Sequence, residues 1–270
     1  MLRLRFLTGA IGLSLVLFSI LSGRPFFTIF VAVVAAACAV EVCRLAPGLH
    51  PRDPLFILAV AWTVLLAVRH QFGYDFGHGL IVTGPLVISL IMLLPVHGGR
   101  RTFVDWAWAT AGAFYVGWLL GLWDGLYLLP SGMSLVLFAM FTTFAYDTGA
   151  FFTGRAFGRH KLAPSISAGK TWEGVAGGTA SALVVALAIR WLTISALGAF
   201  PLSPALVLGG AALIALAAQT GDLVASAVKR SGNVKDAGTV LPGHGGMLDR
   251  FDSLLFTGAA IYYYTLWVIA

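Results

Sequence analysis

About nine apolar segments decide most of what this chain of 270 residues can fold into. An apolar stretch of about 18 or more residues with few charges is typical of a membrane-spanning helix, because a helix pairs all of its own backbone polar groups and lipid pairs none. The segments cover residues 4–21, 25–42, 55–68, 80–95, 103–122, 133–152, 175–192, 202–218 and 253–269. We predict an all-α, polytopic integral membrane protein with about nine transmembrane helices.

The composition supports this prediction, since 59% of the residues are hydrophobic and only 10% are charged. The net charge of +6 could suggest nucleic acid as a partner. The sequence contains no dense run of Lys and Arg, however, and basic residues scattered between apolar segments are typical of topology signals. We therefore expect no nucleic acid partner and predict membrane lipids as the surroundings.

The basic residues also predict the orientation of the chain. With the amino terminus in the cytoplasm, nine spans place all of the 17 Lys and Arg on the cytoplasmic side except Arg24, Arg69 and Arg190. Cytoplasmic loops of membrane proteins carry an excess of Lys and Arg. The pattern favours a multi-pass protein of the bacterial inner membrane type, with its amino terminus inside and its carboxyl terminus outside.

The acidic residues divide the chain into two regions. Up to about residue 140 the few charges lie mostly at the ends of the predicted helices. After it, nine Lys or Arg residues are interleaved with the acidic residues Asp147, Glu173, Asp222, Asp236, Asp249 and Asp252. We predict one membrane domain, 1–270, in which residues 1–132 form amino-terminal transmembrane helices and residues 133–270 form a catalytic transmembrane region near the cytoplasmic side. Glu41, near the end of the second apolar segment, is interpreted as an interfacial residue.

Two features early in the second region are candidates for chemistry. Asp147 lies inside an apolar segment, where a carboxylate is costly and is expected to face a polar cavity; the alternative is solvation at a helix end. The stretch 161–173 places Lys170 in a Ser/Gly/Lys/Thr loop just before a helix, an arrangement that can bind phosphate. The alternative for Lys170 is a basic loop at the lipid headgroups.

Further polar residues follow at helical spacing. Asp222, Ser226 and Lys229 fall within about 80° of one another on a helix, together with Gln219, so that lipid cannot face this stripe. A glycine-rich turn, 242–246, then breaks the helix. Asp249 and Asp252 begin the last helix three residues apart, and for Asp252 simple capping of the helix is an equal alternative.

From Ser226 to Asp252 the chain resembles the signature of the phosphatidate cytidylyltransferase family. The resemblance continues back through the stretches 170–174 and 147–150, with Ala168 standing where the family loop carries Pro. We call residues 226–252 the signature segment. The residues that carry the match are Ser226, Lys229, Arg230, Lys235, Asp236, Gly238, Leu241, Pro242, His244, Gly245, Gly246, Met247, Asp249, Arg250, Phe251 and Asp252.

The resemblance implies roles for residues of the signature segment and for Asp147, Lys170 and Asp222 before it. Asp222 and Asp249 are expected to hold Mg²⁺, with a monovalent cation such as K⁺ beside it, and Asp147, Asp236 and Asp252 are expected to support them. Ser226, His244, Gly245 and Gly246 are expected to shape the substrate pocket. The cations expected at the phosphates of the substrates are Lys170, Lys229, Arg230, Lys235 and Arg250.

The same resemblance implies the reaction. A phosphate oxygen of phosphatidic acid attacks the α-phosphorus of CTP, which gives CDP-diacylglycerol and pyrophosphate, and the enzyme is a homodimer. Two alternatives stay open at this point. A CTP-dependent lipid kinase would share the nucleotide and the membrane but transfer the γ-phosphoryl group. A membrane transporter would also contain intramembrane acids and broken helices, but the polar residues here lack a matching set in the first half of the chain.

Overall fold

The computed structural model describes residues 2–72, 76–94, 102–238 and 245–269. They form two compact units, each of which is described by itself. The first unit consists of Met1–Asp124 together with Lys229–Arg250, and the second consists of Gly125–Val228 together with Phe251–Ala270. The helices α9 (Pro204–Ser231) and α10 (Leu248–Ile269) each contribute residues to both units.

The first unit contains a bundle of helices. They are α1 (Leu2–Leu21), α2 (Arg24–Leu45), α3 (Pro54–Ala67), the short η1 (Arg69–Gln71), α4 (Phe76–Ile91), α5 (Phe103–Ala113), the π-helical η2 (Phe114–Trp118) and the beginning of α6 (Leu119–Leu128). Local sequence explains where two of them begin. The Asp53 side chain accepts a hydrogen bond from the N–H of Leu55, and Thr102 and Asp105 form a reciprocal capping box.

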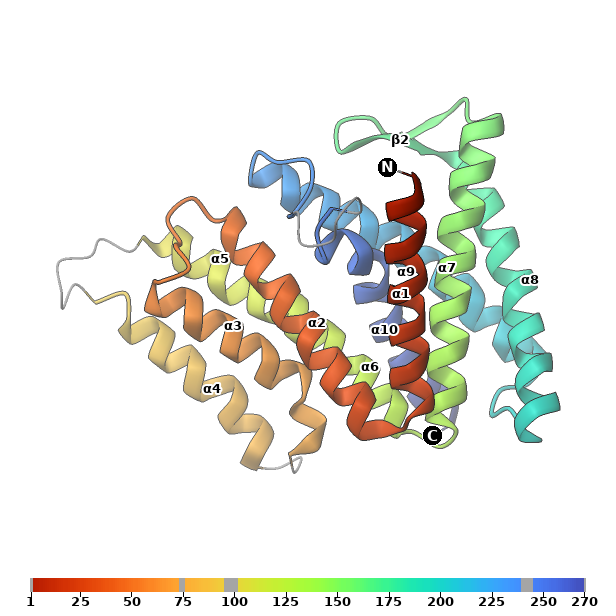
Figure 1. The fold of residues 1–270 in the computed structure, drawn as a ribbon, viewed down its shortest axis with the longest axis horizontal. Coiled ribbons are helices and arrows are strands. Elements are labelled where there is room, and N and C mark those ends of the chain that lie inside the picture. The colour runs from red at the N-terminus through yellow and green to blue at the C-terminus, as the bar shows by residue number, and fades with distance from the viewer. Residues whose placement is uncertain (1, 73–75, 95–101, 239–244, 270) are drawn as a thin grey trace. The chain divides into compact units, whose positions relative to one another are not determined.

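Helices α2, α3 and α5 pack against one another in this unit (Figure 1). Glycine permits the closest approaches. A Cβ atom at Gly112 would lie 2.8 Å from a methyl group of Val42, and one at Gly117 would overlap the backbone of Thr63. Trp62 of α3, which is 1% exposed, packs against Phe114 and donates its indole N–H to the carbonyl of Ile81 in α4 at 2.8 Å. Close packing at small residues is how membrane helices associate, since lipid gives apolar side chains no reason to leave it.

The second unit consists of α7 (Gly132–Phe157), the strands β1 (Lys161–Ala163) and β2 (Ser167–Thr171), α8 (Trp172–Leu197) and most of α9 and α10. Figure 1 shows α7 and α8 side by side along their lengths, which agrees with their contacts. The two backbones approach closely at glycines. A Cβ atom at Gly178 would lie 2.8 Å from the carbonyl oxygen of Tyr146, and one at Gly149 would overlap Ser181.

The link between α7 and α8 differs from the predicted loop. Helix α7 continues to Phe157, and β1 and β2 then form an antiparallel hairpin in which Lys161 lies opposite Thr171. The hairpin ends directly at α8, because the hydroxyl of Thr171 accepts a hydrogen bond from the N–H of Gly174 at 3.1 Å and caps the helix. The hairpin is thus a small β addition to a helical protein.

The predicted all-α membrane fold is otherwise confirmed. Each of the nine apolar segments is mostly helical within the described residues, although α4 ends at Ile91 and α9 begins only at Pro204. The segment from residue 103 continues through α5, η2 and α6. Within the described residues, α2, α7, α8 and α9 are long and apolar enough to cross a membrane. Helix α8 exposes Val184 and Trp191 by 68% and 67%, as expected for side chains that face lipid. The single domain with its boundary at 132/133 stays a prediction.

Candidate functional site

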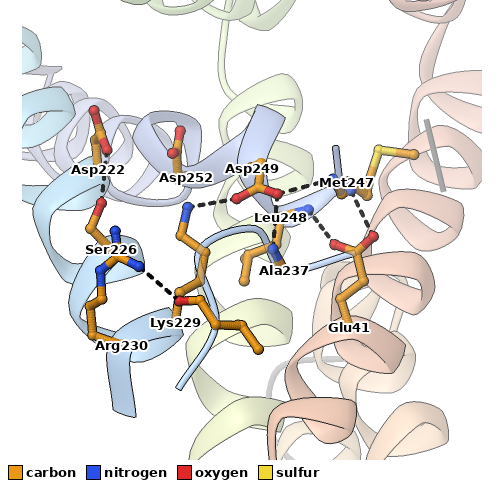
Figure 2. Close-up of polar contacts among 12 residues, drawn as sticks. Glu41, Asp222, Ser226, Lys229, Arg230, Ala237, Met247, Leu248, Asp249 and Asp252 are labelled. Carbon is orange, nitrogen blue, oxygen red and sulfur yellow. Dashed lines mark hydrogen bonds and ion pairs between the residues drawn. The ribbon is translucent and has the colours of Figure 1, made fainter. Parts of the chain in front are cut away.

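In the second unit, Asp222 of α9 lies at the centre of a polar cluster. The Nζ atom of Lys170 is 2.7 Å from Asp222 Oδ2, at ion-pair distance but without the alignment of a hydrogen bond. The hydroxyl of Ser226, one helical turn further along α9, donates to Asp222 Oδ1 at 3.4 Å (Figure 2). The predicted polar stripe is therefore present on α9, and Lys170 of the hairpin forms an ion pair with it.

Contacts at the base of the hairpin hold Lys170 in position. Glu173, in the first turn of α8, accepts hydrogen bonds from the backbone N–H of His160 at 3.2 Å and contacts its Nδ1 at 2.6 Å. The N–H of Trp172 donates to the carbonyl of His160 at 3.0 Å. These contacts connect the two ends of the hairpin. The side chain of Lys170 therefore extends from a strand that is held in place by hydrogen bonds.

Two further carboxylates belong to this cluster. Asp147 of α7 accepts a hydrogen bond from the hydroxyl of Ser253 at 3.2 Å and interacts electrostatically with Asp252, Asp222 and Lys170. Helices α9 and α10 approach closely here, since a Cβ atom at Gly221 would lie 2.7 Å from the carbonyl oxygen of Asp252. The predicted polar surroundings of Asp147 are therefore present. We call Asp147, Lys170, Asp222 and Asp252 the acidic cluster.

The first unit contains a different arrangement, centred on Asp249. The Nζ atom of Lys229 donates to Asp249 Oδ1 at 2.6 Å, and the backbone N–H groups of Ala237 and Gly246 donate to Oδ2 at 3.0 Å each (Figure 2). The side chains of Lys229 and Asp249 are only 11% and 9% exposed. Asp249 therefore connects three separate positions of the signature segment, and both of its carboxylate oxygens accept hydrogen bonds.

Sequence reasoning missed Glu41, and its interpretation as an interfacial residue is wrong. Glu41 is 0% exposed, and its two oxygens accept hydrogen bonds from the backbone N–H groups of Met247 and Leu248 at 2.8 Å each (Figure 2). The available signal was the cost of a carboxylate inside an apolar helix. Its position close to Arg44, at the end of α2, made an interfacial position the simpler interpretation.

The other predicted residues of the signature segment lie closer to the surface. Arg230 is exposed and donates to the carbonyl of Val234 at 3.1 Å, and Lys235, Asp236 and Arg250 are exposed as well. Gly245 has a φ of +81°, a conformation that favours glycine. The N–H of Gly246 is committed to Asp249 in this state. His244 and the rest of the stretch 239–244 lie outside the described residues.

The carboxylates of the two units differ in how well they suit a divalent cation. Among the residues that the structure describes, no group of three or more His, Cys, Asp or Glu side chains is placed to hold a metal ion. Mg²⁺ is usually held by one or two carboxylates with water and substrate phosphates completing its shell. Asp222, with a side chain 34% exposed and further carboxylates as neighbours, fits that requirement. Asp249 fits it only if Lys229 or a backbone donor gives way.

Comparisons with known proteins identify the family of the chain. Residues 3–268 match the Cytidylyltransferase family. The phosphatidate cytidylyltransferase of Bacillus subtilis is 33% identical over 97% of each chain. That of Pseudomonas aeruginosa is 35% identical over 94% of this chain and 93% of its own. That of Brucella suis is 33% identical over 97% of this chain and 92% of its own. Since these matches cover nearly the whole length, the chain belongs to the Cytidylyltransferase family.

Proposed function

We propose that the chain is a phosphatidate cytidylyltransferase, which transfers CMP from CTP to phosphatidic acid and releases pyrophosphate. The observation that carries the proposal is the identity of 33–35% to enzymes of that name over more than nine tenths of both chains. The acidic cluster and the Lys229–Asp249 pair supply the charges that such a reaction needs. Magnesium, a monovalent cation and a homodimer stay predictions.

The transfer reaction does not require a strong general base. The phosphate of phosphatidic acid is already ionised near neutral pH, so catalysis rests on holding two polyanions in line and on neutralising their charge. We propose that Lys170, Lys229, Arg230, Lys235 and Arg250 do this for the phosphates of CTP and of the lipid. A Mg²⁺ ion held by Asp222 and Asp249 would neutralise further phosphate charge.

The ion pairs suggest how this chain prepares for its substrates. Lys170 and Lys229 are each paired with a carboxylate, Asp222 and Asp249 respectively, so neither ammonium group lacks a counter-ion. An arriving phosphate offers each lysine a second anion at similar distance. We propose that the lysines turn toward the phosphates, which frees carboxylate oxygens for the cation. In this way the ligand-free protein avoids burying an unpaired charge.

The proposed topology has nine spans with the amino terminus in the cytoplasm, so that the hairpin and the signature segment both lie on the cytoplasmic side. We expect a cysteine at Ser231 to react with a membrane-impermeant maleimide only from the cytoplasmic side, and one at Ser203, in the loop before α9, only from the outside. Both serines are exposed, whereas the native Cys38 and Cys43 are buried and serve as the unlabelled background. Labelling of both sites from the same side would contradict the nine-span topology.

The deciding test follows the phosphorus atoms of CTP. Purified protein is incubated with phosphatidic acid, Mg²⁺ and CTP labelled at either the α or the γ phosphorus. We expect the α label in the lipid and the γ label in pyrophosphate, because attack at the α-phosphorus keeps the cytidine and the α-phosphate together. Lipid that carries the γ label would indicate a lipid kinase instead. Protein that labels no lipid, in a preparation where the Bacillus subtilis relative does, would refute the proposal.

A further inference from the structure

Glu41 connects the amino-terminal helices to the signature segment. Its carboxylate is completely buried, and each oxygen accepts one backbone N–H, from Met247 and from Leu248, across 206 and 207 positions of the sequence. A carboxylate that accepts backbone N–H groups at the start of a helix is stabilised by the helix dipole, and the helix start is fixed in return. Glu41 of α2 therefore caps α10 from outside its own sequence.

Two glycines of the signature segment lie against the carboxylate of Glu41, so that a larger residue at either position would displace it. A Cβ atom at Gly246 would lie 2.5 Å from Glu41 Oε2, and one at Gly238 would lie 2.6 Å from Oε1. Both contacts are shorter than real Cβ atoms show. The backbone at these two positions therefore packs directly against the carboxylate, and glycine leaves room for it.

The same backbone connects Glu41 to Asp249. Three successive N–H groups, those of Gly246, Met247 and Leu248, are divided between the two carboxylates, the first to Asp249 and the other two to Glu41. The second oxygen of Asp249 holds Lys229. A shift of the backbone at 246–248 would therefore move Asp249 and, through it, the ammonium group of Lys229 (Figure 2).

We infer that Glu41 is a positioning residue for the transfer reaction: it fixes the turn at Gly245–Gly246 and so sets the position of the Lys229–Asp249 pair. The inference rests on the proposed roles of Lys229 and Asp249. Within the part of the chain that the structure describes, the hydrogen bonds of Glu41 come from backbone N–H groups of the signature segment, so its effect on turnover is expected to run through that segment.

The first variant is Glu41→Gln, which keeps the size of the side chain. A glutamine has one acceptor oxygen, and its amide N–H₂ would face the second backbone N–H, so one hydrogen bond is lost and two donors oppose each other. We expect kcat per folded molecule to fall about 100-fold, the cost of a misplacement on the order of 1 Å at reacting groups, with the KM for CTP changed less than about threefold.

The matched control is Asp105→Asn. Asp105 is also a buried carboxylate of the first unit that accepts a backbone N–H at a helix start, but it caps α5. We expect it to lower the thermal unfolding midpoint about as much as Glu41→Gln while leaving kcat within about twofold of wild type. A loss of kcat in Glu41→Gln no larger than in this control would overturn the inference.

A double variant separates positioning from general damage. Gly246→Ala places a methyl group against the same carboxylate, so Glu41→Gln and Gly246→Ala act through one contact. We expect their effects on kcat to be non-additive, so that the double variant is no slower than the slower single variant. For Asp105→Asn combined with Gly246→Ala, we expect the fold-losses in kcat of the two single variants to multiply. Multiplying effects in the Glu41 pair would contradict positioning.

Two further provisions make each outcome decisive. If Glu41→Gln does not fold, Gly238→Ala, which presses on Oε1, replaces it with the same expectations. Wild type is assayed first for transfer of the α label into lipid, so that a wild-type protein without this activity counts against the proposed function, and an active wild type with an unimpaired Glu41 variant counts against the inference alone.

Discussion

Replacing Asp222 by Asn is expected to lower kcat by about 1,000-fold or more while the protein stays folded. The substitution keeps the size and shape of the side chain but removes its negative charge, which is the property a Mg²⁺ ligand needs. It also leaves the ammonium group of Lys170, 15% exposed and 2.7 Å away, without its counter-ion. A loss of this size is typical when one group that stabilises the transition state is removed.

The measurement is the rate of α-label transfer into lipid at saturating CTP and phosphatidic acid, with folding checked by the thermal unfolding midpoint in detergent. Asp124→Asn is the matched control. Asp124 is a completely buried carboxylate that accepts hydrogen bonds from Thr28 and Gln71 in the first unit. We expect this control to keep its kcat within about threefold per folded molecule, since nothing places Asp124 near the reaction. Substantial activity of Asp222→Asn at moderate Mg²⁺ would remove Asp222 from the proposed mechanism.

Hydropathy predicted the helices well for a physical reason. In lipid every backbone polar group must be paired within its own segment, so a long apolar stretch has few structures open to it besides a helix. The hairpin at 161–171 escaped prediction because it lies outside the apolar segments, where the constraint no longer applies. Its residues, rich in Ser, Gly and Lys, have weak strand propensity and indicated a loop.

The candidate site also contains contacts that local sequence predicts and contacts that it does not. Asp222 and Ser226 are one helical turn apart, so the periodicity of a single helix was enough to place them together. The contacts of Glu41 join positions more than 200 residues apart, and no local pattern encodes them. Gly246 was predicted as part of a turn and Gly238 only as part of the signature, whereas the structure shows that both lie against a carboxylate from α2. The start of α10 in the signature segment therefore depends on a side chain from the first half of the chain.

The Lys229–Asp249 pair allows stability to be separated from catalysis. Lys229→Met leaves the carboxylate of Asp249 without its cation, and Asp249→Asn leaves the ammonium group of Lys229 facing an amide. Removing one partner of a buried ion pair typically costs about 3–5 kcal/mol. With both side chains about 10% exposed, each single variant is expected to unfold at a clearly lower temperature and to transfer CMP at least about 100-fold more slowly.

The double variant Lys229→Met/Asp249→Asn is expected to behave differently in the two measurements. It contains no buried unpaired charge, and the remaining amide oxygen of residue 249 can still accept from the N–H groups of Ala237 and Gly246, which now donate to Oδ2. Most of the lost stability should therefore return. Turnover should not return, because the charges that act on the phosphates are absent. If the losses of stability in the two single variants add up in the double variant, the two residues stabilise the fold by contacts other than their ion pair. Recovered turnover would exclude both residues from the reaction.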